Sequence, residues 1–300
     1  MSLMNYSTLI ADKSTVGSIA NFLSYTKLTT EVPIVLDEAQ TLLMTLLRIR
    51  EMRTKTRFTM PVNSAAFPVP SNFLDPIGSM FVLSYNFQMD QKDQSYVALA
   101  RNYNETYGTL GNNPFTTTIG STSVNVFLVN HGFAQESSFY TTGATTFNGV
   151  SIVGTFDITS IVDSNNFIID ITPIGVVPTG AGSGGGTPNY TCDNLVGGTP
   201  LWWAVWDEKF HFDQAFDQQS TCELEYFKSL PPLSLSNQTN VLTNRYPHLL
   251  RPACQVRAAA WMKDTETYQR ELEILTSMTQ AVSVENDMGY RGAIIDTEIP

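Results

Sequence analysis

The chain has 300 residues, 42% of them hydrophobic and 15% charged, which is enough apolar material for one large domain or two moderate ones. A formal net charge of -11 argues against wrapping DNA as a main function, because an acidic chain gains little from counterion release. No apolar run reaches the roughly 20 residues that a membrane span needs.

Two helices are predicted near the start of the sequence. The segment 14–25 places Ile19, Phe22 and Leu23 on one face, with Ser14 or Thr15 as a cap. A second helix begins near Pro33 and runs through 53, with acidic residues early and arginines late, as the helix dipole prefers. Its apolar residues cover most sides, so it is either central in its own domain or buried against another chain.

Strand-like sequence follows from 56 to 87, and a short helix is predicted in "QSYVALARNYNETYG" (94–108). The segment 116–179 contains short runs rich in β-branched residues, separated by glycine, asparagine and serine, which predict an all-β module. The stretch "GAGSGGG" (180–186) is interpreted as a flexible seam that closes this module.

Strands are predicted again over 201–227, followed by two helices up to 284 and a tail without periodicity. The predicted fold class is α+β: a helical-bundle core with a small antiparallel sheet, plus an inserted all-β domain of sandwich or barrel type. The predicted boundaries are 1–115 and 187–284 for the two parts of the core, 116–186 for the insertion and 285–300 for the tail.

Motifs for chemistry are sparse, so no enzyme is predicted, with no catalytic residue, cofactor or metal. His131, His211 and His248 lie far apart without metal-ligand spacing, and the three cysteines (Cys192, Cys222 and Cys254) form no zinc pattern. Gly180, Gly182 and Gly185 match a bare G-x-G-x-x-G, but no helix follows them. The pair Glu223 and Glu225 is interpreted as a solvated strand face, and "LWWAVW" (201–206) as buried strand aromatics.

Several segments of the chain, in order, resemble phage head-to-tail adaptor (connector) proteins. They are "RIREMRT" (48–54), "FPVPSNFLDPIGSMFV" (67–82), "GGTPLWWAVWDEKFHFDQAF" (197–216), "LPPLSLSNQTNVLTNRYPHLL" (230–250) and the helix break "MKDTETY" (262–268). Each motif is weak alone, and their order carries the resemblance, which covers about two-thirds of the chain. Separately, "TTGATTFNGVSIVGTFDITSIVDSNNF" (141–167) is similar to a small β module of phage structural proteins.

The resemblance implies a structural virion protein at the head–tail junction, assembled in the host cytoplasm. Such adaptors form a ring, commonly of about twelve copies, below the portal protein and join it to tail or nozzle proteins or tail fibres. DNA passes through the ring without sequence-specific binding, and no membrane is involved. The alternatives are another neck or tail component, such as a tail hub or stopper, and a carbohydrate-binding virion protein.

On this interpretation the residues group into three sets. The expected oligomer interface is on the second helix: Val35, Leu36, Leu43, Met44 and Leu47. The expected contact with the portal or a neighbour is in the tail region: Tyr290, Arg291, Ile294 and Ile295. A basic cluster is a candidate for the DNA channel or an interface: Arg48, Arg50, Arg53, Lys55 and Arg57. The inserted module is expected to face outward from the ring.

Overall fold

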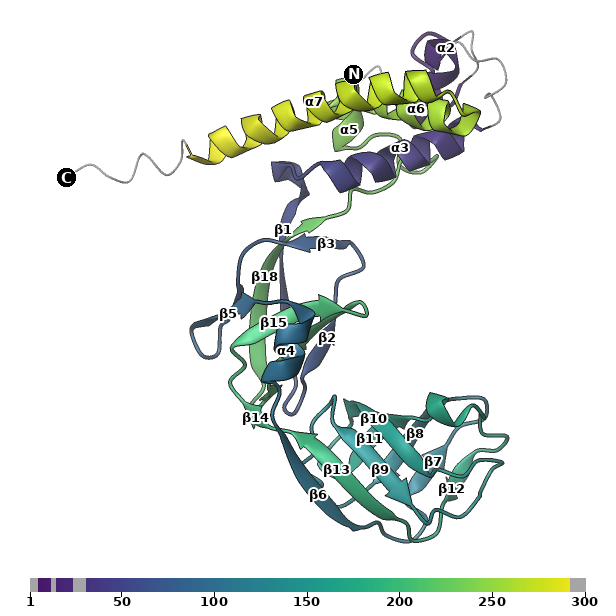
Figure 1. Ribbon diagram of the computed structural model, residues 1–300, viewed down its shortest axis with the longest axis vertical. Coiled ribbons are helices and arrows are strands. Elements are labelled where there is room, and N and C mark those ends of the chain that lie inside the picture. The colour runs from purple at the N-terminus through teal and green to yellow at the C-terminus, as the bar shows by residue number, and fades with distance from the viewer. Residues whose placement is uncertain (1–4, 12–14, 24–30, 292–300) are drawn as a thin grey trace, which may run out of the picture. The chain divides into compact units, whose positions relative to one another are not determined.

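The computed structural model describes residues 5–11, 15–23 and 31–291, with the backbone alone over 285–291 (Figure 1). The chain divides into two compact units. The first, the helical unit, combines Met1–Thr54, Asn72–Asp75 and Tyr226–Pro300, and the second, the strand unit, combines Lys55–Ser71 and Pro76–Glu225.

The helical unit contains the described α-helices except α4. They are α1 (Tyr6–Leu9), α2 (Ile19–Leu23), α3 (Val32–Leu46), α5 (Val241–Asn244), α6 (Pro247–Met262) and α7 (Thr265–Arg291), with the 3₁₀ turn η1 (Arg50–Met52). Helix α6 packs against both α3 and α7 (Figure 1). The buried faces of these helices form one apolar core, with Leu36, Leu43, Leu249, Val256 and Leu275 among its members. The helices therefore bury their apolar sides mainly against one another.

Local sequence explains where these helices begin and end. Asn240 caps α5 in a capping box with Thr243, and Pro33 occupies the first turn of α3, where a missing N–H costs nothing. Lys263 takes a left-handed conformation that ends α6, and Asp264 then accepts a hydrogen bond from Thr267 N at the start of α7. Helix α7 continues to Arg291, so the region predicted as an aperiodic tail from 285 is helical over its first seven residues.

Buried polar contacts join the distant segments of the helical unit. Gln40 of α3 is 3% exposed, and its Oε1 accepts hydrogen bonds from Leu233 N (3.0 Å) and Asn240 Nδ2 (3.2 Å). The side chain of Asn72 accepts from the Tyr226 hydroxyl (2.8 Å), and its carbonyl accepts from Ser229 N (2.7 Å). Because a buried donor without a partner is costly, these bonds fix the register of the segments.

The first sheet has eight strands in the order β1-β18-β4-β5-β15-β16-β2, with β3 pairing β18. Their bounds are β1 (Arg53–Met60), β2 (Ala66–Pro68), β3 (Phe73–Pro76), β4 (Met80–Val82), β5 (Phe87–Gln91), β15 (Trp202–Trp206), β16 (Lys209–Phe212) and β18 (Ser220–Lys228). Helix α4 (Gln94–Ala100) contacts β15, and a parallel pair joins β14 (Gly197–Gly198) to β17 (Ala215–Phe216).

The second sheet, the β module (Tyr103–Leu195), also has eight strands, in the order β12-β7-β8-β11-β10-β9-β13-β6. Their bounds are β6 (Tyr103–Thr109), β7 (Phe115–Thr117), β8 (Ser123–Phe127), β9 (Ser138–Thr142), β10 (Gly154–Ile161), β11 (Asn166–Asp170), β12 (Gly182–Gly184) and β13 (Asn189–Leu195), with a 3₁₀ turn η2 (Thr172–Ile174). The sheet curls on itself (Figure 1). Its core includes Phe133, Phe139, Phe167 and Tyr190, with five ring pairs at centroid distances of 5.1–6.1 Å.

The predicted fold class is wrong. The chain is built mostly of strands in two eight-stranded sheets, so it is not a helical-bundle core with a small sheet. Strands such as β2 and β4 are only three residues long, which leaves little local periodicity, and they pair with the distant strands β16 and β18. The β module also extends by one strand beyond each predicted boundary (116 and 186).

The glycine stretch lies inside the β module and packs against its core. Gly182–Gly184 form β12, which pairs with β7. A Cβ on Gly184 would lie 2.3 Å from the Phe147 ring, and one on Gly185 would lie 2.4 Å from the Phe115 ring. Gly185 also has a φ of 103°, which L side chains rarely adopt. The glycines therefore allow a close approach of the chain to two aromatic rings, and the interpretation as a flexible seam does not hold.

The three cysteines, Cys192, Cys222 and Cys254, are free thiols that are buried in the fold. Burial raises the pKa of each thiol to about 12. Among the helices that the structure describes, none combines the length and the apolar character of a membrane span.

Candidate functional site

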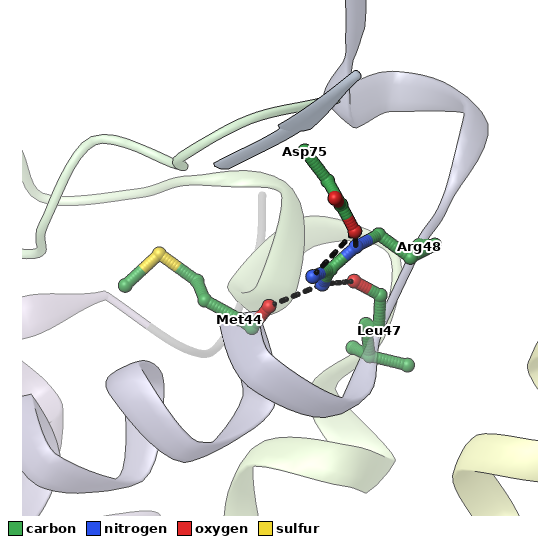
Figure 2. A network of polar contacts seen from close by, with 4 residues as sticks. All are labelled: Met44, Leu47, Arg48 and Asp75. Carbon is green, nitrogen blue, oxygen red and sulfur yellow. Dashed lines mark hydrogen bonds and ion pairs between the residues drawn. The ribbon is translucent and has the colours of Figure 1, made fainter. Parts of the chain in front are cut away.

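The basic cluster begins where α3 ends. Arg48 Nη1 donates to the carbonyl oxygens of Met44 (2.8 Å) and Leu47 (2.9 Å), and its Nε and Nη2 lie 3.4 Å from Asp75 Oδ2 (Figure 2). A cation that binds the last carbonyls of a helix satisfies unpaired acceptors and complements the helix dipole. Arg48 therefore has a structural role in joining α3 to the segment around Asp75.

The other members of the basic cluster lie along η1 and β1. Arg48 and Arg53 each place a guanidinium within 5.8 Å of the centre of the Phe227 ring. Lys55 Nζ lies 3.6 Å from Glu223 Oε1, and Arg57 donates to Glu223 Oε2 at 2.6 Å. The hydrogen bond from Arg57, together with both positive charges, holds the pKa of Glu223 below its ordinary value.

These contacts limit the cluster as a DNA-binding surface. Arg48, Lys55 and Arg57 each have an acidic partner, and Arg50 is exposed in η1. The positive field offered to a phosphate backbone is reduced accordingly, since counterion release depends on cations that are free to meet phosphates. Of the Glu223–Glu225 pair, Glu223 belongs to this ion-pair network.

The five residues expected at an oligomer interface lie in the helical unit itself. Val35, Leu36, Leu43 and Leu47 are at most 3% exposed in its core, and Met44 packs against that core half-buried. Their burial requires no second copy of the chain. The sequence left open whether the helix is central in its own domain, and the structure shows that it is. The apolar side chains of α3 that remain exposed are Ile34 and Leu46.

The expected portal contacts fall at the end of the described chain. Tyr290 and Arg291 are the last two residues of α7. Ile294 and Ile295 lie outside the described residues. The structure therefore gives a helical backbone at the first pair and leaves the contact itself as a prediction.

The isolated histidines do not form catalytic arrangements. His131 Nδ1 accepts a hydrogen bond from Phe133 N (2.9 Å), and its Nε2 lies 3.0 Å from the carbonyl oxygen of Asp163. Burial lowers the pKa of His131 despite that carbonyl. His248 is exposed in the first turn of α6. In the described part of the chain, no three histidine, cysteine or acidic side chains group as metal ligands.

The tryptophans of "LWWAVW" (201–206) are buried or half-buried, in line with the prediction of buried strand aromatics. Trp203 is fully buried and donates its indole N–H to the carbonyl oxygen of Met89 (3.2 Å). Trp202 is half-buried and meets Tyr96 edge-on. Neither offers the open indole face that stacking on a sugar or base requires.

Sequence reasoning missed a buried polar cluster between the two sheets of the strand unit. Glu136 Oε2 lies 3.7 Å from Arg101 Nη1 and 3.5 Å from His211 Nδ1. His211 stacks on Trp206 with ring centres 3.7 Å apart, and Arg101 donates through Nε to the carbonyl oxygen of Phe212 (3.1 Å). The residues are far apart in sequence and match no motif, so only the fold brings them together.

Charge within this cluster favours ionised Glu136. Burial raises the pKa of Glu136, but the nearby His211 ring and the charges of Arg101 and Lys209 outweigh it and hold the pKa below its ordinary value. The Arg101 side chain is 8% exposed, and its Nη2 is buried without a hydrogen-bond partner. Buried donors nearly always have a hydrogen-bond partner, so this one is an exception.

A polar cavity of about 410 Å³ opens beside the cluster. It is lined by Arg101, Tyr103, Glu136, Ser138, Asp157 and Asp193. The lining offers donors from arginine, serine and tyrosine together with three carboxylates as acceptors. This is the polar site that the geometry marks out in the strand unit.

Comparison with known proteins gives little support for any assignment. No protein-family model matches the chain, and no curated protein does so. Among solved structures, one match is "Phage phi92 endosialidase", which is 15% identical in sequence, with a TM-score of 0.24. The match covers 47% of this chain and 20% of that protein, so the chain spans about a fifth of its length. A likeness of this size carries no argument about fold or function.

Proposed function

We propose that the chain is a non-enzymatic structural protein of a phage virion, and that its role is that of a head-to-tail adaptor. The observation that carries the proposal is the assembly of motifs in the helical unit. Three motifs of the resemblance, "RIREMRT", "LPPLSLSNQTN" and "MKDTETY", lie in that one unit, together with Asn72–Asp75 from the motif "FPVPSNFLDP".

Specific contacts join these motifs. Arg48 of the first motif pairs with Asp75 of the second (Figure 2). Asn72 of the second bonds to Tyr226 and to Ser229, which directly precedes the third, and Gln40 bonds to Leu233 and Asn240 of the third. Each motif alone is weak evidence for the family resemblance. The contacts between the first three motifs support the interpretation that they belong to one structure.

The adaptor role includes a ring of about twelve copies that meets the portal on one side and tail or nozzle proteins on the other. The helical unit keeps exposed apolar side chains that such contacts can bury. Trp261 of α6 is 54% exposed, and Ile34, Leu46 and Ile274 are also exposed. Large exposed aromatic residues are typical anchors of protein interfaces. We place the ring contact on these residues rather than on the buried side of α3.

The virion location and the passage of DNA belong to the same proposal. The net charge of -11 suits a channel through which DNA slides without sticking. The basic cluster is partly neutralised by its acidic partners, which fits a role in folding or in an interface rather than in tight DNA binding.

Native mass spectrometry of the full chain, alone and mixed with the portal protein of the same genome, tests the proposal. The expected result is a ring-sized complex that joins the portal, and a Trp261→Ser variant with at least tenfold weaker assembly. Leu99→Ser is the matched control, because Leu99 is an exposed apolar residue on α4 of the strand unit.

Two outcomes would overturn the adaptor role. If the chain stays monomeric and does not bind the portal protein, it is not an adaptor. A chain that assembles with tail proteins but not with the portal is a tail hub or stopper instead.

A further inference from the structure

One outer face of the β module carries two rows of side chains in register. In antiparallel pairs, directly opposed residues point to the same side of a sheet. The first row crosses β10, β9, β13 and β6 at Asp157, Ser138, Asp193 and Glu105. The second row, two residues along, crosses the same strands at Thr155, Tyr140, Thr191 and Tyr107. We call these two rows, with Tyr103, the tyrosine face.

The tyrosines of this face are open to solvent. Tyr107 is 80% exposed, Tyr103 is 45% exposed and Tyr140 is 44% exposed. Tyr140 and Tyr107 lie in one row with a single strand between them, so their Cα atoms are about 10 Å apart, twice the strand spacing. Two phenol rings at this spacing form a platform that an extended ligand can span.

The polar cavity beside Arg101 continues the same face. Four of its lining residues, Tyr103, Ser138, Asp157 and Asp193, belong to the tyrosine face. Arg101 and Glu136 close the cavity, and the buried Nη2 of Arg101 is the unpartnered donor there. The two tyrosines and the cavity therefore lie on one continuous surface, and the cavity provides both hydrogen-bond donors and acceptors.

We propose that the tyrosine face and its cavity bind a neutral oligosaccharide. A sugar ring presents apolar C–H faces, which stack on aromatic rings, and hydroxyl groups, each of which both donates and accepts. Asp157 and Asp193 accept from such hydroxyls, and Arg101 and Ser138 donate to them. The two rows supply aromatic, hydroxyl and carboxylate groups, which is the mixture that this ligand class needs.

Charge separates this ligand from the anionic candidates. The carboxylates of Glu105, Asp157 and Asp193 repel nucleic acid and acidic sugars. They attract a basic peptide, so the experiment below tests that ligand separately. A protein interface is favoured by an apolar core, whereas the two rows carry no aliphatic side chain. The inference holds for the module whether or not the adaptor role is correct.

An array of neutral, sialylated and sulfated glycans, probed with the full chain, tests the inference. We expect binding to neutral glycans, with little change when salt rises, because neutral ligands are not screened. Tyr107→Ala and Tyr140→Ala should each weaken binding by roughly tenfold. Asp193→Asn, which keeps the size of the side chain, should weaken it by a similar factor.

Phe127→Ala is the matched control, since Phe127 is an exposed aromatic residue on β8 of the same module, away from the two rows. Each variant is first checked for an unchanged melting temperature. The inference is overturned by an array on which no neutral glycan binds, or by binding that Tyr107→Ala leaves unchanged. Salt-sensitive binding to an arginine-rich peptide, with no glycan bound, would assign the face to a basic partner.

Discussion

The helical unit and the β module bury their cores by different routes along the chain. The helical unit collects three separate segments, packs aliphatic helix faces together and ties the segments with buried polar bonds such as those of Gln40. The β module is one continuous segment whose core includes a cluster of aromatic rings and whose close approaches need glycine. The helical unit therefore depends on contacts between separate segments of the chain, and the β module on contacts within one segment.

The largest effect is expected for Gly185→Ala in the β module. The new Cβ would meet the Phe115 ring, and the positive φ adds backbone strain, so we expect a loss of about 3 kcal/mol in the free energy of unfolding. Chemical denaturation followed by tyrosine and tryptophan fluorescence measures it.

Gly111→Ala is the control for this substitution, because nothing lies within 4 Å of its added Cβ. If both variants were equally stable, the stretch 180–186 would be the flexible seam that the sequence suggested.

The second effect is expected for Gln40→Met in the helical unit. The change leaves Leu233 N buried without an acceptor, at a cost of about 2 kcal/mol. Since the two units have separate cores, differential scanning calorimetry should show the transition of the helical unit moving down while the other stays in place.

Glu38→Gln, at an exposed position on the same helix, should leave both transitions unchanged. A shift of both transitions together in Gln40→Met would mean that the two units unfold as one.

The smallest effect is expected for Glu136→Gln, which weakens the polar cluster between the sheets by about 1 kcal/mol at neutral pH. The folded-state pKa of Glu136 lies below its ordinary value, so its stabilising effect is complete above the unfolded value of about 4.3 and is lost as pH falls through the folded pKa. The stability difference between the two proteins should therefore shrink on acidification.

Melting temperatures of both proteins from neutral pH to about pH 3 give this difference. Glu208→Gln, at an exposed turn, serves as the control. A difference that stays constant with pH would show that the charge of Glu136 does not stabilise the fold.

The sequence predicted the elements whose pattern is local. The helices after Pro33 and after Asp264, the short helix α4 and the alternating strand β11 all show the periodicity expected of them. The helix after Pro33 nevertheless ends at Leu46, and residue 53, its predicted end, begins strand β1. Helix α4 likewise ends at Ala100, before the end of the predicted segment. The buried tryptophan Trp203 was also predicted.

The rest depends on pairings that sequence does not display. The first sheet joins β2 to β16 and β4 to β18, and each of these pairs is more than a hundred residues apart. The contact of Arg101 with Glu136, and the registers that align Tyr107 with Tyr140, also join residues that no local pattern connects. The glycines of 180–186 were interpreted as a flexible segment, because a glycine-serine sequence is flexible where no neighbouring side chain packs against it.

The two ends of the β module have a consequence for how such a chain can arise. Tyr103 on the entering strand and Leu195 on the leaving strand are register partners, so the chain enters and leaves at points about 5 Å apart. A gene fragment encoding the whole module can therefore be gained, lost or exchanged by recombination at one point of a host fold without stretching it. The same geometry makes this position a natural acceptor for a foreign domain.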